Sequence, residues 1–175
     1  MVKKNNLVKT FSKWGPDFAI QFEFKILKRP AEWHSVLHLT TGENCCNKGS
    51  RIPGIFLNSD GQGTYMYLTI AMTGKEKTKK YWLDLNKWLS MELNKKNGQF
   101  SVVLDGVVVW TVESGHEQFQ NVQFFLSDKF YPSASYNVEG ASGENMIELR
   151  KLIVSRGSHE VTNFDGKLST NVQAM

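Results

Sequence analysis

Phe18-Ala-Ile-Gln-Phe-Glu-Phe-Lys-Ile26 is the stretch of this chain that decides its fold, because large apolar residues alternate strictly with small or polar ones. One side holds Phe18, Ile20, Phe22, Phe24 and Ile26, and the other holds Ala19, Gln21, Glu23 and Lys25. A period of two is typical of a β-strand with one buried face and one wet face. The large apolar side chains need a second layer to cover them, so the stretch predicts a β-sandwich.

Short stretches of strand pattern, separated by turn residues, continue along the rest of the chain. Residues 100–104 and 107–112 flank Asp105-Gly106, which supplies the positive φ angles of a tight hairpin turn, and Ser59–Gly63 is expected to form another turn. Further strands are expected at 7–11, 35–40, 52–58, 65–72, 79–85, 88–94, 121–127 and 146–155. No apolar pattern of period 3.6 reaches helical length. The predicted fold class is therefore all-β, a two-sheet antiparallel β-sandwich in residues 1–156, with 157–175 as a C-terminal tail or a small strand addition.

The composition is that of an ordinary soluble domain, with 41% hydrophobic and 22% charged residues in 175. No apolar run approaches the roughly 20 residues needed to cross a bilayer, so membrane insertion is not expected. No apolar segment follows the basic start, so no signal peptide is expected, which fits a cytosolic protein or a domain cut from a secreted precursor. The net charge of +4 suits anionic partners such as sulfated glycans, although lysines in loops also keep strand edges soluble. A nucleic-acid partner is not expected, and the oligomeric state stays open.

The order of several motifs between residues 14 and 154 resembles that of a known group of domains. The motifs are Trp14–Phe18, Ser35–Gly42, Cys45-Cys46, Gly49–Ile55, Leu85–Trp88, Leu104–Val107, Asn121-Val122, Ser127-Asp128 and Phe130–Pro132. In this order they resemble the laminin-G-like group of concanavalin A-like jelly rolls found in secreted invertebrate proteins. The resemblance implies two antiparallel sheets, one convex and one concave, in an extracellular setting. It also implies a ligand that is a glycan, a matrix protein or, in shell and skeleton matrices, a mineral-associated polymer.

The same resemblance raises the question of calcium. Laminin-G-like domains often bind one calcium ion at the rim of the sandwich, with an acidic residue expected just before the Arg-Ile-Pro segment. This chain has Ser50 at that place, which departs from the pattern. Asp60, Asp105 and Asp128 remain as oxygen donors for calcium. Asp60 and Asp105 each precede a glycine, however, and turn formation explains them as well.

No catalytic motif stands out, so the chain is not expected to be an enzyme. Glycosidases of this fold place two carboxylates on one strand of the concave face, commonly as Glu-x-Asp-x-x-Glu, and no such run occurs. Of the alternating stretch, only Glu23 offers a carboxylate on the wet side. A Gly-x-Ser-x-Gly elbow is also missing from the sequence. His34 and His38 would share one strand face about 13 Å apart, too far to hold one zinc ion together.

Cys45 and Cys46 are adjacent, and they are the only cysteines in the chain. Three states remain open: a vicinal disulfide within the 41–51 loop, two free thiols, or bonds between chains. A vicinal disulfide would suit an oxidising compartment.

Aromatic and basic residues supply the predicted binding surface. Sugar-binding faces commonly expose Trp or Tyr rings beside polar groups, whereas Trp14, Trp88 and Trp110 lie within apolar patterns and are expected in the core. The expected ligand-binding residues are Lys75, Lys77, Lys79, Lys80, Tyr65, Tyr67 and Trp82. The predicted function is non-catalytic extracellular recognition of carbohydrate or a sulfated matrix polymer. The alternatives are a structural or protein-interaction domain of an extracellular or biomineral matrix protein, and a glycoside hydrolase with an unrecognised site.

Overall fold

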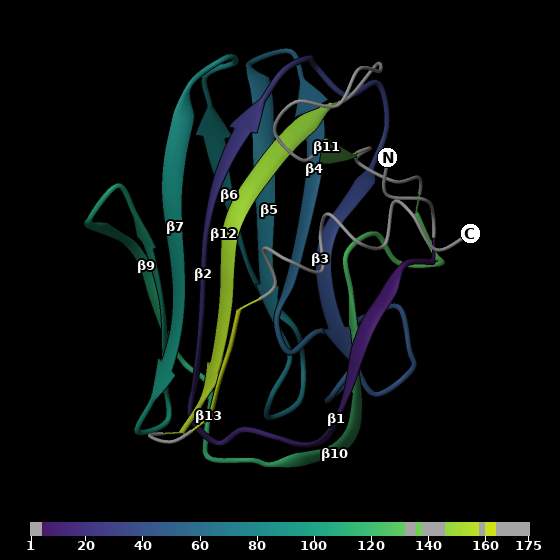
Figure 1. Ribbon diagram of the computed structural model, residues 1–175, viewed down its shortest axis with the longest axis vertical. Helices are drawn as coiled ribbons and strands as arrows, with labels where there is room; N and C mark the ends of the chain where they lie inside the picture. Colours follow the sequence, from purple (N-terminus) through teal and green to yellow (C-terminus); the bar gives the residue numbers. More distant parts are fainter. Residues whose placement is uncertain (1–4, 132–135, 138–145, 158–159, 164–175) are drawn as a thin grey trace.

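Two stacked β-sheets make up the computed structural model, which describes residues 5–131, 136–137, 146–157 and 160–163 (Figure 1). The strands are β1 (Leu7–Trp14), β2 (Phe18–Ile26), β3 (His34–Thr40), β4 (Gly54–Asp60), β5 (Gly63–Ile70), β6 (Lys77–Leu83), β7 (Trp88–Lys96), β8 (Gln99–Leu104), β9 (Val107–Glu113), β10 (Phe119–Phe125), β11 (Tyr136–Asn137), β12 (Ile147–Arg156) and β13 (Glu160–Asn163). The described residues contain no helix, and hence no helix that could span a membrane. The predicted two-sheet β-sandwich is confirmed.

One sheet has six strands in the order β1-β10-β3-β4-β5-β6. The other has seven, in the order β11-β12-β2-β7-β8-β9 with β13 paired to β12. Among the described residues, every pairing is antiparallel except the short parallel pair between β11 and β12. Figure 1 shows β12, β2 and β7 of the seven-stranded sheet in front of β4, β5 and β6.

The core lies between the sheets and follows the alternation of β2. All five apolar residues of that strand are at most 4% exposed, while the residues between them are half-buried or exposed. The same alternation buries Leu89, Met91 and Leu93 of β7. On the opposite sheet, the side chains that meet them include Leu37, Leu39, Ile55, Leu57, Met66 and Leu68. Alternation in both sheets therefore places one set of side chains in the core and leaves the other on two outer faces.

The three tryptophans expected in the core have different environments. Trp14 is fully buried, and its indole N–H donates to the carbonyl oxygen of Ile52 at 2.6 Å. Trp110 is half-buried and packs edge-on against Phe100. The prediction for Trp88 was wrong, because it pairs with Lys25 on the outer face of its sheet, where Lys25 and Arg150 lie over its ring.

The expected boundaries differ from the structure mainly at the turns. The turn expected over residues 59–63 is tighter, because Asp60 pairs with Gly63 and only Gly61 and Gln62 lie between the strands. Within the expected C-terminal extension, β13 adds to the edge of the sheet by pairing with β12. The domain boundary at residue 156 stays a prediction.

A buried histidine–aspartate pair ties two loops to β3. His38 Nδ1 lies 2.7 Å from Asp128 Oδ2, and its Nε2 lies 2.7 Å from the carbonyl oxygen of Ser50. Both ring nitrogens therefore face oxygen atoms. The other carboxylate oxygen of Asp128 accepts the backbone N–H groups of Phe130 and Tyr131 at 2.9 and 3.0 Å. Burial alone would raise the pKa of Asp128, but the hydrogen bonds and charge from His38, with the two backbone N–H groups, outweigh burial and lower it.

We predict that Asp128→Asn lowers the free energy of unfolding by about 3–5 kcal/mol at pH 7, because it removes one partner of a buried pair. A lowered pKa means that the carboxylate stabilises the fold above its unfolded value of 3.8, and that this contribution is lost as the pH falls through the folded-state pKa. The difference in the free energy of unfolding between the variant and the parent protein, measured by urea denaturation, should therefore be smaller near pH 2. Asp84→Asn, at an exposed position, is the control. A loss of equal size at both pH values would contradict this account.

Candidate functional site

The outer face of β5 and β6 carries a group of aromatic side chains. Cross-strand pairing sets Tyr65 opposite Trp82 and Tyr67 opposite Lys80, while Met66, Leu68 and Tyr81 of the same strands face the core. Trp33, which precedes β3, lies edge-on to both tyrosines, with ring centroids 5.9 Å from Tyr65 and 5.3 Å from Tyr67. We call Trp33, Tyr65, Tyr67, Lys80 and Trp82 the aromatic surface.

The members of the aromatic surface differ in exposure. Tyr65 is only 4% exposed, beneath Trp33, Trp82 and Lys80. It therefore forms the floor of the surface and offers no free ring face to a ligand. Trp82 is 43% exposed, with its ring centroid 5.9 Å from that of Tyr65. The side chain with the most ring area available for stacking is therefore Trp82.

Opposite charges flank the Trp82 ring. Lys80 Nζ lies 4.2 Å from the centroid of Tyr65 and 3.9 Å from Asp60 Oδ2. The backbone N–H of Gln62 contributes most to lowering the pKa of Asp60, and the side chain of Trp82 and the charge of Lys80 add to it against the opposing effect of burial. The Asp60 carboxylate therefore lies near the Trp82 side chain as well as near Lys80. An exposed ring thus lies beside one hydrogen-bond donor and one acceptor, both partly exposed.

The structure does not bring the four expected lysines together. Lys77 and Lys79 lie on the opposite side of β6 from Lys80, because side chains alternate along a strand. Lys77 Nζ donates to the carbonyl oxygen of Glu113, and Lys75 is exposed in the loop before β6. Of the four, only Lys80 belongs to the aromatic surface.

The three aspartates considered for calcium lie apart. Asp60 ends β4, and Asp105 sits in the β8–β9 turn, where its Oδ1 accepts the backbone N–H of Ser90 at 2.8 Å. Asp128 is buried and already occupied by His38. Among the residues that the structure describes, the one group of three metal-ligating side chains is Cys45, Cys46 and Glu76. The expected calcium ligands therefore do not form a common site.

The outer face of the seven-stranded sheet is hollowed. A hollow of about 390 Å³ is lined by Gln21, Glu23, Ser90, Glu92 and Lys151, among others. A second hollow of about 760 Å³ lies on the same strands, at a place where the outward side chains are small and leave open space. These residues include Ala19, Asn94, Ser101 and Ser155, which are in register across the sheet.

Two carboxylates share the smaller hollow. Glu23 pairs with Ser90 and Glu92 pairs with Gln21, so the two glutamates are diagonal neighbours, with backbones about 7–8 Å apart. Glu23 accepts hydrogen bonds from Lys151 at 2.7 Å and Arg150 at 2.6 Å, and these two bonds lower its pKa. Glu92 was not among the residues predicted from the sequence, although the alternation of Leu89, Met91 and Leu93 could have shown that it faces outward with Glu23.

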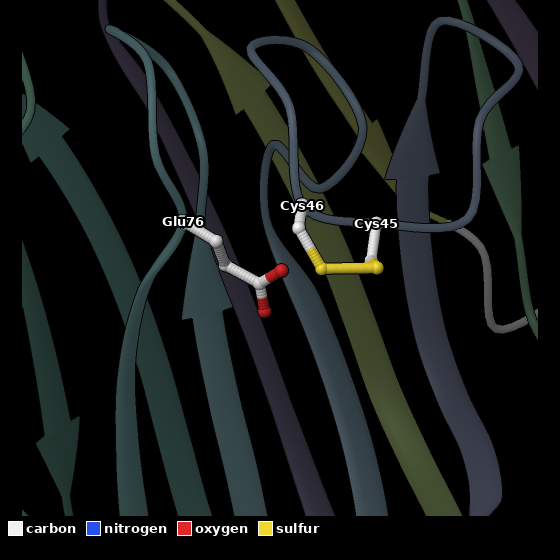
Figure 2. Close-up of side chains that lie close together, drawn as sticks. All are labelled: Cys45, Cys46 and Glu76. Atoms are coloured by element: carbon white, nitrogen blue, oxygen red, sulfur yellow. A yellow bond between two sulfur atoms is a disulfide. The ribbon is translucent and has the colours of Figure 1, made fainter.

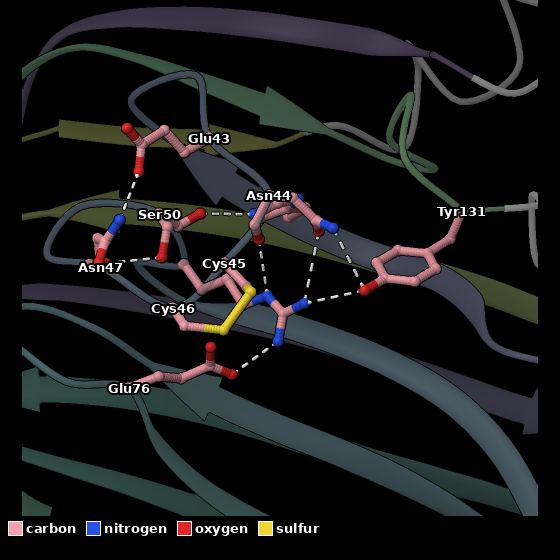
Figure 3. Close-up of a disulfide and its surroundings, with 10 residues drawn as sticks. Glu43, Asn44, Cys45, Cys46, Asn47, Ser50, Glu76 and Tyr131 are labelled. Atoms are coloured by element: carbon pink, nitrogen blue, oxygen red, sulfur yellow. Dashed lines mark hydrogen bonds and ion pairs between the residues drawn. A yellow bond between two sulfur atoms is a disulfide. The ribbon is translucent and has the colours of Figure 1, made fainter.

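Cys45 and Cys46 form a disulfide in the segment between β3 and β4 (Figure 3). Arg51 holds the surroundings of this disulfide together. Its Nε donates to the carbonyl oxygen of Asn44 at 2.9 Å, its Nη1 to Glu76 Oε1 at 2.6 Å, and its Nη2 to the hydroxyl of Tyr131 at 3.3 Å. This network links loops that are far apart in the sequence, and sequence analysis did not identify it.

Comparison with known proteins gives no family model and no curated protein that matches the sequence. Solved structures do match. A native heptameric SAP-like pentraxin from Limulus polyphemus has a TM-score of 0.51 and 12% identity over 91% of this chain and 84% of its own. The LG4–5 domains of the mouse laminin α1 chain have a TM-score of 0.47 and 16% identity, covering 93% of this chain and 38% of theirs. Alginate lyase PA1167 from Pseudomonas aeruginosa has a TM-score of 0.48 and 12% identity, covering 80% and 64%. At these identities the likeness concerns the fold alone, and this chain has the concanavalin A-like jelly-roll fold.

Proposed function

We propose that this chain is a non-catalytic recognition module that binds carbohydrate through the aromatic surface. The observation that carries the proposal is the exposed Trp82 ring, which has the Asp60 carboxylate and Lys80 of the same strand face near it. Its natural setting would be extracellular, where a disulfide such as Cys45–Cys46 persists.

The chemistry of this surface suits a sugar ring. A pyranose has an apolar C–H face that can cover the indole of Trp82, which offers a rigid amphipathic platform. Its hydroxyl groups can donate to the carboxylate of Asp60 and accept from the ammonium group of Lys80. A few well-placed polar groups beside apolar area are what fixes the orientation of a small ligand.

The placement of the lysines changes the expected role of charge. Four lysines on one surface would make binding of a sulfated polymer fall steeply as the salt concentration rises. Only Lys80 shares a face with Trp82, so stacking should supply most of the affinity and one ion pair should supply the preference for acidic sugars. A weak dependence on salt is therefore expected.

We predict that Trp82→Ala reduces the affinity for a bound oligosaccharide by roughly thirtyfold, about 2 kcal/mol, as expected for an aromatic hot spot. Lys80→Ala should reduce the affinity for a heparin-derived oligosaccharide several-fold and remove its remaining salt dependence. Lys79→Ala is the matched control, since it removes the same charge from the other side of the same strand. Isothermal titration after a glycan-array screen measures these effects. Equal binding by Trp82→Ala and the parent protein, or equal losses in the two lysine variants, would refute the proposed site.

A second candidate function is cleavage of a glycosidic bond in the hollow of the seven-stranded sheet. The observation in its favour is the Glu23–Glu92 pair, since carboxylates about 5–10 Å apart serve as the two catalytic groups of glycosidases. The lowered pKa of Glu23 suits only the ionised role, so Glu92 would have to be the acid. Because Glu23 is held by two cations, we rank this candidate below binding.

A reducing-end assay with alginate, a β-glucan and chitin distinguishes the two candidates. If the protein is a recognition module, the parent protein should produce no new chain ends, and Glu92→Gln should give the same result. Product formation that Glu92→Gln abolishes, while Glu148→Gln leaves it intact, would establish cleavage and overturn the non-catalytic proposal. Glu148 is a suitable control because it lies in the same sheet, paired with Lys25.

A further inference from the structure

Cys45, Cys46 and Glu76 form a compact group with no part in the proposed sugar site. The two sulfur atoms and one carboxylate oxygen of Glu76 all lie within 4.8 Å of one another. Figure 2 shows the carboxylate of Glu76, from the loop before β6, directed toward the disulfide. The backbone N–H of Glu76 also donates to the carbonyl oxygen of Cys46 at 3.3 Å, which joins the two loops.

Only one of the two carboxylate oxygens of Glu76 has a partner among the described residues. Its side chain is 7% exposed, and its Oε1 pairs with Arg51 at 2.6 Å. Its Oε2 is buried and has no hydrogen-bond partner among the described residues. An unpartnered buried carboxylate oxygen is costly, and a disulfide has no hydrogen to give it. The oxidised state therefore leaves one ligand atom of Glu76 without a partner beside the two sulfur atoms.

We propose that reduction of the Cys45–Cys46 bond opens a site for a thiophilic divalent cation such as Zn²⁺, bound by the two thiolates and Glu76 Oε2. A dithiol reductant would cleave the S–S bond, giving two cysteine thiols and the oxidised, cyclic form of the reductant. Binding of the cation to both thiols then releases two protons. Zinc prefers sulfur, nitrogen and carboxylate ligands in a tetrahedral arrangement, and water would complete this set of three protein ligands.

The distances and charges fit such an ion. Two sulfurs bound to one tetrahedral Zn²⁺ at about 2.3 Å each lie about 3.8 Å apart, so the two sulfurs must separate after the S–S bond is cleaved, while the group as a whole spans no more than 4.8 Å. Two thiolates and one carboxylate carry three negative charges, which the cation and Arg51 together balance. Arg51 bonds Oε1 and leaves Oε2 without a partner, and such a bond orients a ligating carboxylate.

Hydrogen bonds that involve no sulfur atom also hold the loop. Arg51 donates to Asn44, Ser50 Oγ donates to the carbonyl oxygen of Asn47 at 2.6 Å, and the backbone N–H of Thr41 donates to the carbonyl oxygen of Gly49 at 3.0 Å. These bonds remain when the S–S bond opens. Reduction therefore creates two ligands without releasing the segment that carries them.

The test compares the full chain in its oxidised form and after reduction by a phosphine, with Zn²⁺ alone as the probe in isothermal titration. The reduced chain should bind one Zn²⁺ per molecule, and the oxidised chain should bind none at this site. Cd²⁺ should produce thiolate-to-metal charge-transfer absorption in the reduced chain only. Equal Zn²⁺ binding by both forms, or none by the reduced form, would overturn the proposal.

Variants identify the third ligand. Glu76→Gln should weaken Zn²⁺ binding by about 10–100-fold, and Glu43→Gln, which changes a carboxylate of the cysteine-bearing segment outside the group, should leave it unchanged. As a second readout, bound Zn²⁺ should protect both thiols from alkylation. This readout applies even if Glu76→Gln lowers the stability of the fold. If Glu76→Gln and Glu43→Gln gave the same Zn²⁺ affinity and the same protection of the thiols, Glu76 would not be the third ligand.

Discussion

The alternation of apolar and polar residues along paired strands is the constraint on which the rest of this structure depends. In β2 it buries five large side chains against the opposite sheet and leaves Gln21, Glu23 and Lys25 outside. Because the period is two, a slip of one residue would turn the core outward, so packing sets the register of the neighbouring strands as well. That register decides which side chains meet on each outer face.

Both candidate surfaces follow from this register. Pairing of β5 with β6 brings Trp82 and Lys80 beside the tyrosines, and pairing of β2 with β7 brings Glu23 beside Glu92. The buried His38–Asp128 pair, by contrast, joins loops to β3, an interior strand of the six-stranded sheet, and contacts the cysteine-bearing segment through Ser50. The two candidate surfaces thus lie on the outer faces of the sheets, while the loops bring together the group proposed to bind an ion.

The sequence predicted the features that depend on local pattern. The bounds of β2, the Asp105-Gly106 turn and the absence of helical periodicity all follow from neighbouring residues, and the structure agrees with them over the described residues. Features that depend on pairing were harder to predict. Trp88 looked apolar in its own strand, but it faces outward opposite Lys25, and the four lysines divide between two sides of β6. Glu76 could not be assigned to the cysteines, because it lies thirty positions after Cys46 and only the folded loops bring them together.

The central claim is that a sugar binds over Trp82 on the outer face of β5 and β6. Nitrogen–proton correlation spectra of the labelled chain, recorded during titration with a heparin-derived oligosaccharide, test it most directly. The account predicts that the indole N–H signal of Trp82 and the backbone signals of β5, β6 and Gln62 move first. Shifts confined to residues of the seven-stranded sheet, such as Gln21 and Glu92, would contradict it.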